Sequence, residues 1–526
     1  MNTKSIFSAL LFLILAPVFV QAATSQYTLS YRDNPGTTIV IGWSGDNGTV
    51  HFGTTDFGTN ANSYPNQQGT DRQATAHGIN RKFVRLTGLT PNTTYYFVIK
   101  DVNNQVSARF KFVTLSNNPN DPVSFISGGD TRDGFKVFGA YVEDCPSGNC
   151  LEQKRKGNRL VAKIRPDFIA FNGDFVMNQV TSNTNAEWNE WLNDWQLTIS
   201  TDGRMYPMTF TQGNHEDNAD MYNLFDIPIE EYYSLSIHNG LLRLYMLNSE
   251  LNACSNAQQL TWLTNDLQTH TNTANDPTWK FVQYHIPTFA MGNSYGLVGD
   301  QMSCWVNLFE QHNVRLAMES HTHITKWTFP CVANSSDTDF EQNANGIVYI
   351  GEGQWGAPHR SLDFTGANQK PYVRAQGVFD NFYFIRVTPQ QTTIQSVLFN
   401  GNDNLTPLTS DSLGKQLPGG ILVWNPASGN QVVLQNNTGG LNNNGKTLFS
   451  KISPNPVVNI LNVESKNAMQ DAVIEIYNGL GKLVKSETVK SNKKYQIDLT
   501  NMPAGQGNVI VKFKDGRIES HTFVKL

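Results

Sequence analysis

The chain has 526 residues, a formal net charge of -5 and a charged fraction of 16%. This length exceeds what a single hydrophobic core supports, so we expect several domains. The near balance of 39 basic and 44 acidic residues excludes a nucleic-acid platform, while 11% aromatic residues and abundant glycine indicate a β-rich extracellular protein.

Residues 1–22 have the pattern of a signal peptide. Lys4 precedes an apolar stretch from Ile6 to Val20, and small residues follow up to Ala22. An apolar stretch of about 15 residues is shorter than the roughly 20 that cross a bilayer as a helix. We therefore expect a cleaved leader rather than a membrane anchor.

The five cysteines fit the oxidising compartment that such a leader implies. Cys145 and Cys150 are close enough in sequence to form a disulfide across a short loop. Cys254, Cys304 and Cys331 leave an odd count, so we expect at least one free thiol. No Cys-x-x-Cys pair occurs, which argues against a structural zinc site.

Residues 24–116 alternate short β-type runs with turn residues, as in Thr37–Trp43 and Phe83–Leu86. This pattern predicts a small β-sandwich. The segment Leu86–Phe97 resembles the turn before a late strand of fibronectin type III domains, in which a Tyr near the strand start ties the corner together.

Between residues 122 and 400 strand-like and helix-like runs alternate, which predicts an α/β domain. We expect strands at Val123–Ile126, Phe168–Phe171, Met208–Thr211, Leu242–Leu247, Lys280–Tyr284 and Val314–Met318. We expect helices over Leu160–Ile164, Trp188–Trp195, Leu260–Leu267 and Trp305–Phe309.

The end of the chain changes composition twice. Residues 401–448 are rich in Asn, Gly, Thr and Ser, which predicts a linker. Residues 449–526 return to β-type alternation, as in Val473–Tyr477 and Val509–Phe513, which predicts a second small β-sandwich.

Five short polar motifs follow the apolar strands of the central domain, where open α/β sheets place ligands and catalytic groups. They share carboxylate, imidazole and amide side chains, the donors that first-row metal ions bind. In chain order the motifs are Gly129-Asp130, Gly173-Asp174, Gly213-Asn214-His215-Glu216, Tyr284-His285 and Ser320-His321-Thr322-His323. Each motif alone is common in turns or cores, so the interpretation depends on the ordered set.

This ordered set resembles the metallophosphoesterase (calcineurin-like) superfamily and, with a β-sandwich in front, its purple acid phosphatase branch. The resemblance implies a four-layer αββα central domain and two metal ions, Fe, Zn or Mn. It also implies hydrolysis of phosphate monoesters by a metal-bound hydroxide. Asp174 would bridge both ions. The other ligands implied are Asp130 and His323 for the first ion, and Asn214, His285 and His321 for the second.

Two further side chains have catalytic roles under this hypothesis. His215 would donate to the phosphoryl oxygens or protonate the leaving group, with a structural hydrogen bond as the alternative. Arg132 would bind the substrate phosphate, with a surface salt bridge as the alternative. Loops after strands supply candidate residues that line the pocket: Trp355, His359, Arg360 and Tyr295.

The chain departs from its relatives around the first metal. The purple branch carries a Tyr three residues after the bridging Asp, where this chain has Met177, and other branches have Asp-x-His where this chain has Asp130-Thr131-Arg132. The first site therefore has one protein ligand fewer, and we expect no purple colour. Alternative functions are a phosphodiesterase or nucleotidase on the same site, or a non-catalytic surface binding protein on a degenerate scaffold.

The segments Ile452–Val463, Ile476–Lys482 and Phe523–Leu526 resemble the C-terminal sorting domain of the type IX secretion system. The resemblance implies contact with that secretion machinery in a Bacteroidetes-type bacterium. Release, or attachment to the outer-membrane surface, would follow removal of the tail. The alternative is a carbohydrate-binding sandwich, which the few aromatic residues of this segment disfavour.

Overall fold

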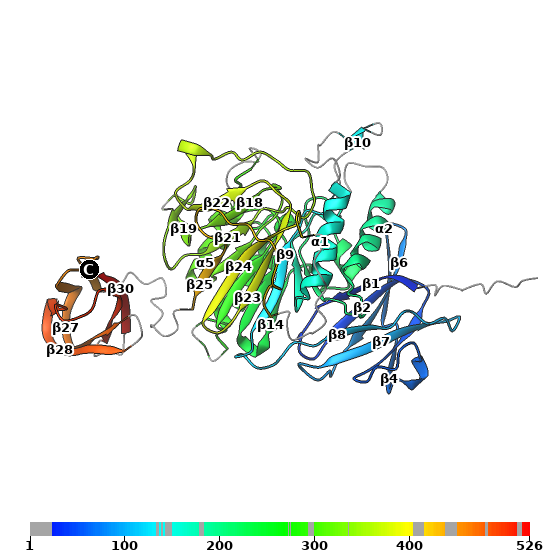
Figure 1. Cartoon of the computed structure of the whole chain (residues 1–526), viewed down its shortest axis with the longest axis horizontal. Helices are drawn as coiled ribbons and strands as arrows, with labels where there is room; N and C mark the ends of the chain where they lie inside the picture. The colour runs from blue at the N-terminus through cyan, green and yellow to red at the C-terminus, as the bar shows by residue number, and fades with distance from the viewer. Residues whose placement is uncertain are drawn as a thin grey trace, which may run out of the picture.

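A computed structural model describes residues 24–132, 136–137, 140–141, 150–177, 184–271, 273, 275–292, 299–334, 336–402, 415–436, 450–478, 482–512 and 518–526. Figure 1 shows three parts along the chain, a β-rich N-terminal part, a central α/β part and a β-rich C-terminal part. The multidomain fold class predicted above is confirmed. The predicted signal peptide lies outside the described residues. Within those residues, no helix combines the length and the apolar character needed to cross a bilayer.

The N-terminal part is a sandwich of two antiparallel four-stranded layers. One layer contains β1 (Thr24–Ser30), β2 (Ile39–Gly45), β5 (Arg72–Ala76) and β6 (Ile79–Leu86). The other contains β3 (Gly48–Gly53), β4 (Asn66–Gly69), β7 (Thr94–Asp101) and β8 (Phe110–Val113). Alternate residues such as Ile41, Trp43 and Phe97 are fully buried between the layers. At the expected corner, the Tyr95 hydroxyl accepts a hydrogen bond of 3.0 Å from the Thr90 amide.

The first layer of the sandwich continues into the central domain. The ten-stranded sheet has the order β25-β24-β23-β9-β12-β13-β1-β2-β6-β5, and β1 joins β13 in parallel with Ser30 opposite Met208. The strands that the central domain contributes to it are β9 (Val123–Gly128), β12 (Phe168–Phe171), β13 (Met208–Phe210), β23 (Asn381–Val387), β24 (Gln391–Leu398) and β25 (Val432–Gln435). The N-terminal sandwich and the central domain therefore share one backbone hydrogen-bond ladder.

A seven-stranded sheet packs against the central strands of the first. It has the order β14-β15-β16-β17-β21-β18-β22. Its strands are β14 (Tyr233–Ile237), β15 (Leu242–Met246), β16 (Trp279–Gln283), β17 (Leu316–Met318), β18 (Thr325–Thr328), β21 (Val348–Gly351) and β22 (Val373–Gly377). Residues of both sheets, including Phe125, Ile169, Phe281 and Ile350, share one buried core.

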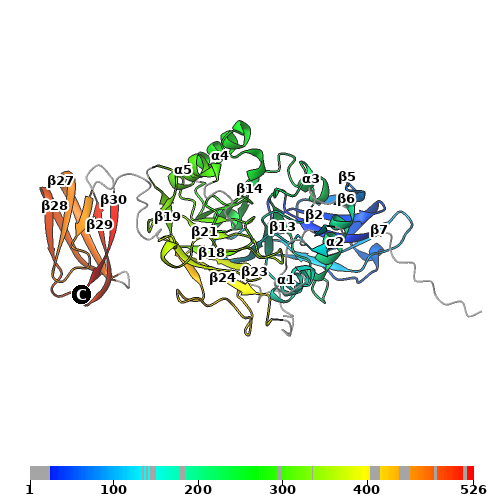
Figure 2. The same cartoon turned by 90° about the horizontal axis from the view of Figure 1, so that it is seen from above.

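Helices cover the two outer faces of this pair of sheets (Figure 2). The helices are α1 (Cys150–Ile164), α2 (Thr184–Trp195), α3 (Asp220–Phe225), α4 (Ala257–Thr269) and α5 (Trp305–Gln311). Buried side chains of α1 and α2 join the core of the first sheet, while Leu263, Trp305 and Phe309 pack on the second. The predicted four-layer αββα arrangement is confirmed. Two small hairpins complete the domain, β10 (Lys136–Val137) with β11 (Ala140–Tyr141) and β19 (Cys331–Ala333) with β20 (Phe340–Gln342).

The predicted linker over 401–448 is wrong in part. Val432–Gln435 forms β25, which pairs with β24 at the edge of the ten-stranded sheet. Side chains of a strand point alternately to its two faces. Val432 and Leu434 therefore share the buried face of β25 and are 2% exposed, while Val433 on the opposite face is more exposed. The Asn- and Gly-rich stretch at 437–449 lies outside the described residues.

The C-terminal part has a core of its own. Its strands are β26 (Ser450–Ser453), β27 (Ile460–Asn478), β28 (Leu483–Asp498), β29 (Gly505–Lys512) and β30 (Ile518–Lys525), all antiparallel where they pair. Residues such as Leu461, Ile474 and Val511 fill the core between them.

The cysteines divide into bonded and free. Cys254 and Cys304 form a disulfide, and Cys331 is free and buried, as the odd count required. Cys150 is also disulfide-bonded. Cys145, its expected partner, lies outside the described residues.

Candidate metal centre

The polar motifs meet because parallel strands end side by side. In the first sheet Phe171 lies opposite both Gly128 and Phe210, so the segments after β9, β12 and β13 leave the same edge. In the second sheet Met318 lies opposite Gln283 and Ile350, so the segments after β16, β17 and β21 leave together as well. Packing of the two sheets brings these edges face to face.

Four of the candidate ligands have a backbone conformation that non-glycine residues rarely adopt. Asp130, Asp174, His321 and His323 have φ values of 59°, 56°, 82° and 54°. The packing around one of these turns is close. A Cβ on Gly353 would lie 1.6 Å from Asp130 Oδ2, so only glycine fits beside that carboxylate.

The first donor group consists of Asp130, Asp174 and His323, all buried. His323 Nε2 lies 3.2 Å from Asp130 Oδ1, and His323 Nδ1 donates to the Pro358 carbonyl at 2.7 Å. The Asp130 carboxylate also accepts from the His321 amide at 3.0 Å. The carbonyl fixes the tautomer of His323 and turns the lone pair of Nε2 toward Asp130.

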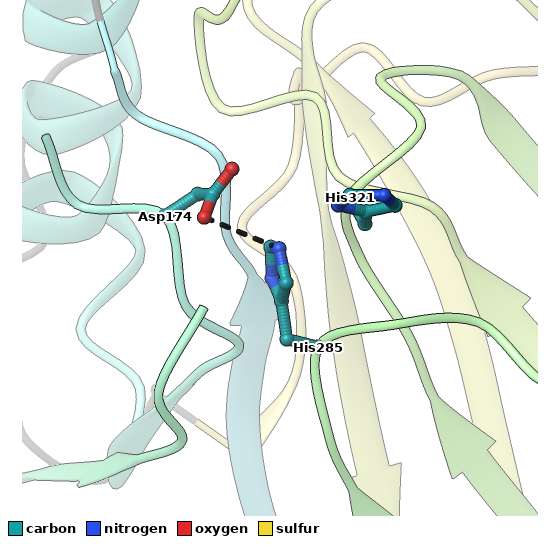
Figure 3. A group of neighbouring side chains, drawn as sticks. All are labelled: Asp174, His285 and His321. Carbon is teal, nitrogen blue, oxygen red and sulfur yellow. Dashed lines mark ion pairs between the residues drawn. The ribbon is translucent and has the colours of Figure 1, made fainter. Parts of the chain in front are cut away.

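The second donor group consists of Asp174, His285 and His321 (Figure 3). His285 Nε2 lies 3.2 Å from Asp174 Oδ1 and 3.1 Å from Asn214 Oδ1, while His285 Nδ1 contacts the Asn172 carbonyl at 2.8 Å. Asn214 Oδ1 is also 2.8 Å from His321 Nδ1. Asp174 belongs to both groups, and the amide oxygen of Asn214 adds a neutral donor.

The donor set fits metal ions on two counts. Among the described residues, His323 Nε2 is a buried polar atom without a hydrogen-bond partner. Burial lowers the pKa of His323 well below its usual range and that of His321 to about 3, so both imidazoles stay neutral, as ligands must be.

The two buried carboxylates, of Asp130 and Asp174, favour positive charge at a nearby group. Burial works against a charged His285, yet the carboxylates of Asp174 and Asp130 outweigh burial and raise its pKa. A proton on His285 therefore supplies the positive charge that a bound cation would supply beside the carboxylates of Asp174 and Asp130. The two donor groups, which share Asp174, could each hold a cation.

The predicted catalytic residues lie beside this centre. His215 is half-buried, its Nε2 is 3.8 Å from Asp174 Oδ2, and its amide donates to Asp174 Oδ1 at 3.3 Å. Arg132 Nε lies 3.8 Å from Asp174 Oδ2. Because Arg132 is 1% exposed, the alternative of a surface salt bridge is wrong.

The loop after β21 contacts the centre through Gly353 and Pro358, but two of the side chains that the sequence suggested have other partners. Trp355 is fully buried and its indole donates to Asn158 Oδ1 at 3.2 Å, so it supports α1 and does not line a pocket. His359 bonds Asp380 at 3.0 Å, whereas Arg360 Nη1 reaches the His321 carbonyl at 3.4 Å. Tyr295 lies outside the described residues.

Sequence reasoning missed the role of Glu216. Its buried carboxylate accepts from the amides of Asp174 at 3.0 Å, Phe175 at 2.8 Å and Gly213 at 2.8 Å. One side chain therefore joins the loop that carries Asp174 to the loop that carries Asn214. Its place in the Gly213–Glu216 motif was visible, but a carboxylate bonded only to backbone amides has no signature in sequence.

Family models match three successive regions of the chain. Residues 24–114 match the purple acid phosphatase N-terminal domain, residues 112–325 the calcineurin-like phosphoesterase domain, and residues 451–525 a secretion-system C-terminal sorting domain. No curated protein matches the chain in sequence.

Two solved structures are similar in fold. The purple acid phosphatase PPD1 from yellow lupin (Lupinus luteus) seeds is 14% identical with a TM-score of 0.55, over 73% of this chain and 73% of that one. PhoD is 11% identical with a TM-score of 0.55, over 80% of this chain and 92% of that one. The C-terminal match indicates handling by type IX secretion. These matches support a metal-dependent phosphoesterase, with a central region similar to the calcineurin-like phosphoesterases after a region similar to the purple acid phosphatase N-terminal domain.

Proposed function

We propose that the protein hydrolyses phosphate monoesters at a two-metal centre. The ligands proposed are Asp130, Asp174, Asn214, His285, His321 and His323. One observation carries the proposal: two donor groups share the carboxylate of Asp174, and each combines side chains that follow strands of both sheets. A pair of metal ions, when bound, activates water near neutral pH and neutralises charge on the phosphoryl group.

The chain itself contributes orientation. Backbone carbonyls hold Nδ1 of His285 and His323, so the Nε2 atoms keep fixed directions. Burial lowers the pKa of His215 below its usual value, which leaves a neutral imidazole with one N–H. We assign this N–H to the substrate, where it donates to the phosphoryl oxygens and protonates the leaving group.

A preference for monoesters follows from the buried charge beside Asp174. A monoester carries one more negative charge than a diester, and the guanidinium of Arg132 is a permanent cation whose planar donors match phosphate oxygens. Arg360, next to the His321 carbonyl, would add a second cation at the edge of the site.

The activity test compares matched esters and matched variants. The protein loaded with Mn²⁺, Zn²⁺ or Fe²⁺ should release phosphate from p-nitrophenyl phosphate and act more slowly on bis(p-nitrophenyl) phosphate. Asp174→Ala should lose the activity, while Asp498→Ala, which removes an exposed carboxylate of the C-terminal part, should keep it. A faster rate on the diester would favour a phosphodiesterase or nucleotidase instead.

Metal content separates an enzyme from a binding protein on the same scaffold. We expect about two metal ions per chain after reconstitution and dialysis. Fewer than one ion per chain, together with no phosphate release, would favour the binding protein. We expect no purple colour from an iron-loaded sample, since Met177 stands where the coloured relatives have Tyr.

We further propose that the mature protein is secreted or displayed at the cell surface. Cleavage of residues 1–22 and removal of the C-terminal sorting domain would produce it. Mass spectrometry of protein recovered from culture medium and from washed cells should give a mature N-terminus near Ala23. A tail retained on all secreted molecules would contradict the second cleavage.

A further inference from the structure

The loop that carries Asn214 and His215 is held on both sides by the N-terminal sandwich. Upstream of the loop, β1 of the sandwich pairs with β13, and the Tyr31 amide donates to the Met208 carbonyl at 3.0 Å. Downstream of the loop, the segment 217–226, which includes α3, lies beside β5 and β6 (Figure 2). The two flanks of the loop thus rest on one domain.

Four basic side chains of the β5–β6 hairpin contact alternate residues of this segment from Asp220 to Asp226. His77 Nε2 lies 2.7 Å from Asp220 Oδ1. Arg72 donates to the Tyr222 carbonyl at 2.8 Å, and its guanidinium lies 3.6 Å from the centre of the Tyr222 ring. We call Arg72, His77, Arg81 and Arg85 the hairpin clamp.

The other two members of the clamp, Arg81 and Arg85, share one face of β6 because side chains of a strand alternate between its faces. They lie four residues apart. Arg81 is fully buried and donates to the Leu224 carbonyl at 3.0 Å. Arg85 makes a bidentate pair with the fully buried Asp226, at 2.6 and 2.7 Å.

Hydrogen bonds connect the residues that the clamp contacts to the loop with Asn214 and His215. The Asp217 amide donates to Asp220 Oδ2 at 2.9 Å, and Glu216 ties the residues before it to the Asp174 loop. Only residues 215–219 separate Asn214 from α3, so a shift of α3 would displace this loop directly.

The group of His77, Asp217 and Asp220 also has ligand atoms within 4.8 Å of one another. However, His77 Nε2 and both oxygens of Asp220 already have hydrogen-bond partners within the group. We therefore interpret this group as an ion pair that positions α3 and not as a third metal site.

We propose that the hairpin clamp consists of positioning residues, through which the N-terminal sandwich sets the place of Asn214 and His215 at the metal centre. This inference rests on the proposed function for its kinetic part only. A misplacement of about 1 Å in a catalytic group is enough to reduce a rate by one to two orders of magnitude.

Two variants weaken the clamp at partly exposed contacts. His77→Asn removes the pair with Asp220, and Asn tolerates the φ of 50° found at this turn. Arg72→Gln removes the bond to Tyr222. Lys111→Gln is the matched control, since it breaks another ion pair of the sandwich, with Asp202 at 2.8 Å, which does not involve residues 214–226.

Kinetics should separate positioning from general loss of structure. We expect each clamp variant to lower kcat about 10-fold on an alkyl phosphate and less on p-nitrophenyl phosphate, since a good leaving group depends less on His215. KM should change little, and the weaker Mn²⁺ site should lose roughly 10-fold in affinity. Equal losses on both esters with unchanged Mn²⁺ affinity would contradict positioning.

Hydrogen exchange tests the clamp without any activity. Amides of residues 213–219 should exchange faster in His77→Asn and Arg72→Gln than in the wild type, and Lys111→Gln should leave them unchanged. If the wild type hydrolyses no ester, the proposed function fails while the exchange result still decides the clamp. Unchanged exchange in both clamp variants overturns the inference.

Discussion

The two small β domains at either side of the phosphoesterase domain relate to it in different ways. The N-terminal sandwich extends the ten-stranded sheet and contributes Leu29, Trp43 and Phe97 to the same hydrophobic cluster as the central domain. The C-terminal part has a cluster formed only by residues after 450. The first is therefore built into the scaffold of the metal centre, whereas the second folds around its own core.

The polar contacts of the two domains show the same difference. Arg81 and Asp226 are fully buried charges where the N-terminal sandwich meets the central domain. The ion pairs of the C-terminal part, such as Lys512 with Glu475 and Lys494 with Glu464, join neighbouring strands of that part and are partly exposed. Buried contacts of this kind stabilise one relative position of two domains, while exposed pairs contribute little.

Deletion of residues 24–116 gives the largest expected effect. It removes β1 from β13 and opens the shared core to water, so we expect insoluble protein or protein without a cooperative thermal transition. Solubility, size-exclusion chromatography and circular dichroism measure this. A soluble, active fragment would show that the sandwich is a separable module.

Replacement of the buried guanidinium of Arg81 should have the next largest effect on stability. Arg81→Met leaves the carbonyls of Leu224 and Gln26 and the hydroxyl of Thr28 without this donor. We expect a loss of about 3 kcal/mol in the free energy of unfolding. Lys82→Met lies one residue along β6 and removes a bond from the Lys82 amine to Gln73 at the surface, so it should change this free energy by less than about 0.5 kcal/mol. Chemical denaturation measures both.

Much of the metal centre could be predicted from the sequence, because parallel strands place the residues that follow them at one edge. Asp130, Asp174 and His285 were identified in this way, and the structure brings them together. Alternating strand and helix patterns predicted an α/β central domain, and the resemblance to the metallophosphoesterases implied its four αββα layers. The strand expected at Val314 begins only at Leu316, since the Val314 amide bonds Phe309 at the end of α5.

The contacts that hold the centre in place could not be predicted. Arg81 occupies a β-strand position that a local pattern assigns to solvent, and its acceptor Leu224 is 143 residues away. Glu216 acts through backbone amides, which every sequence offers. The short helix α3 lies in a run without helical periodicity, and its place is determined by tertiary contacts with the sandwich.

A smaller effect should appear as a pH dependence of stability. The hydrogen bond to Asp220 raises the pKa of His77, with Asp217 and Asp220 as the facing charges. The pair therefore stabilises the folded state fully below the unfolded imidazole pKa of about 6.5, and this contribution is lost as pH rises through the higher folded pKa.

The comparison of His77→Asn with the wild type measures this contribution. We expect a difference in unfolding free energy of at most about 1 kcal/mol at pH 5.5 that shrinks toward pH 9. For Lys111→Gln the difference should stay constant over this range. Burial opposes a charged Asp202, but its hydrogen bonds with Arg165 and Lys111 outweigh burial and hold its pKa far below neutrality. A growing difference for His77→Asn at high pH would contradict the ion pair.

Removal of the C-terminal part should have the smallest effect on the metal centre. A chain that ends at residue 449 keeps every residue of the two donor groups and the whole shared core. We expect kcat, KM and metal content within about twofold of the full chain, because contacts that do not reach a site change its energetics only slightly. A large loss of activity would mean that the C-terminal part takes part in the scaffold, and the two β domains would then be equivalent. An unchanged centre, together with the collapse expected on deletion of residues 24–116, would assign the supporting role to the N-terminal sandwich alone.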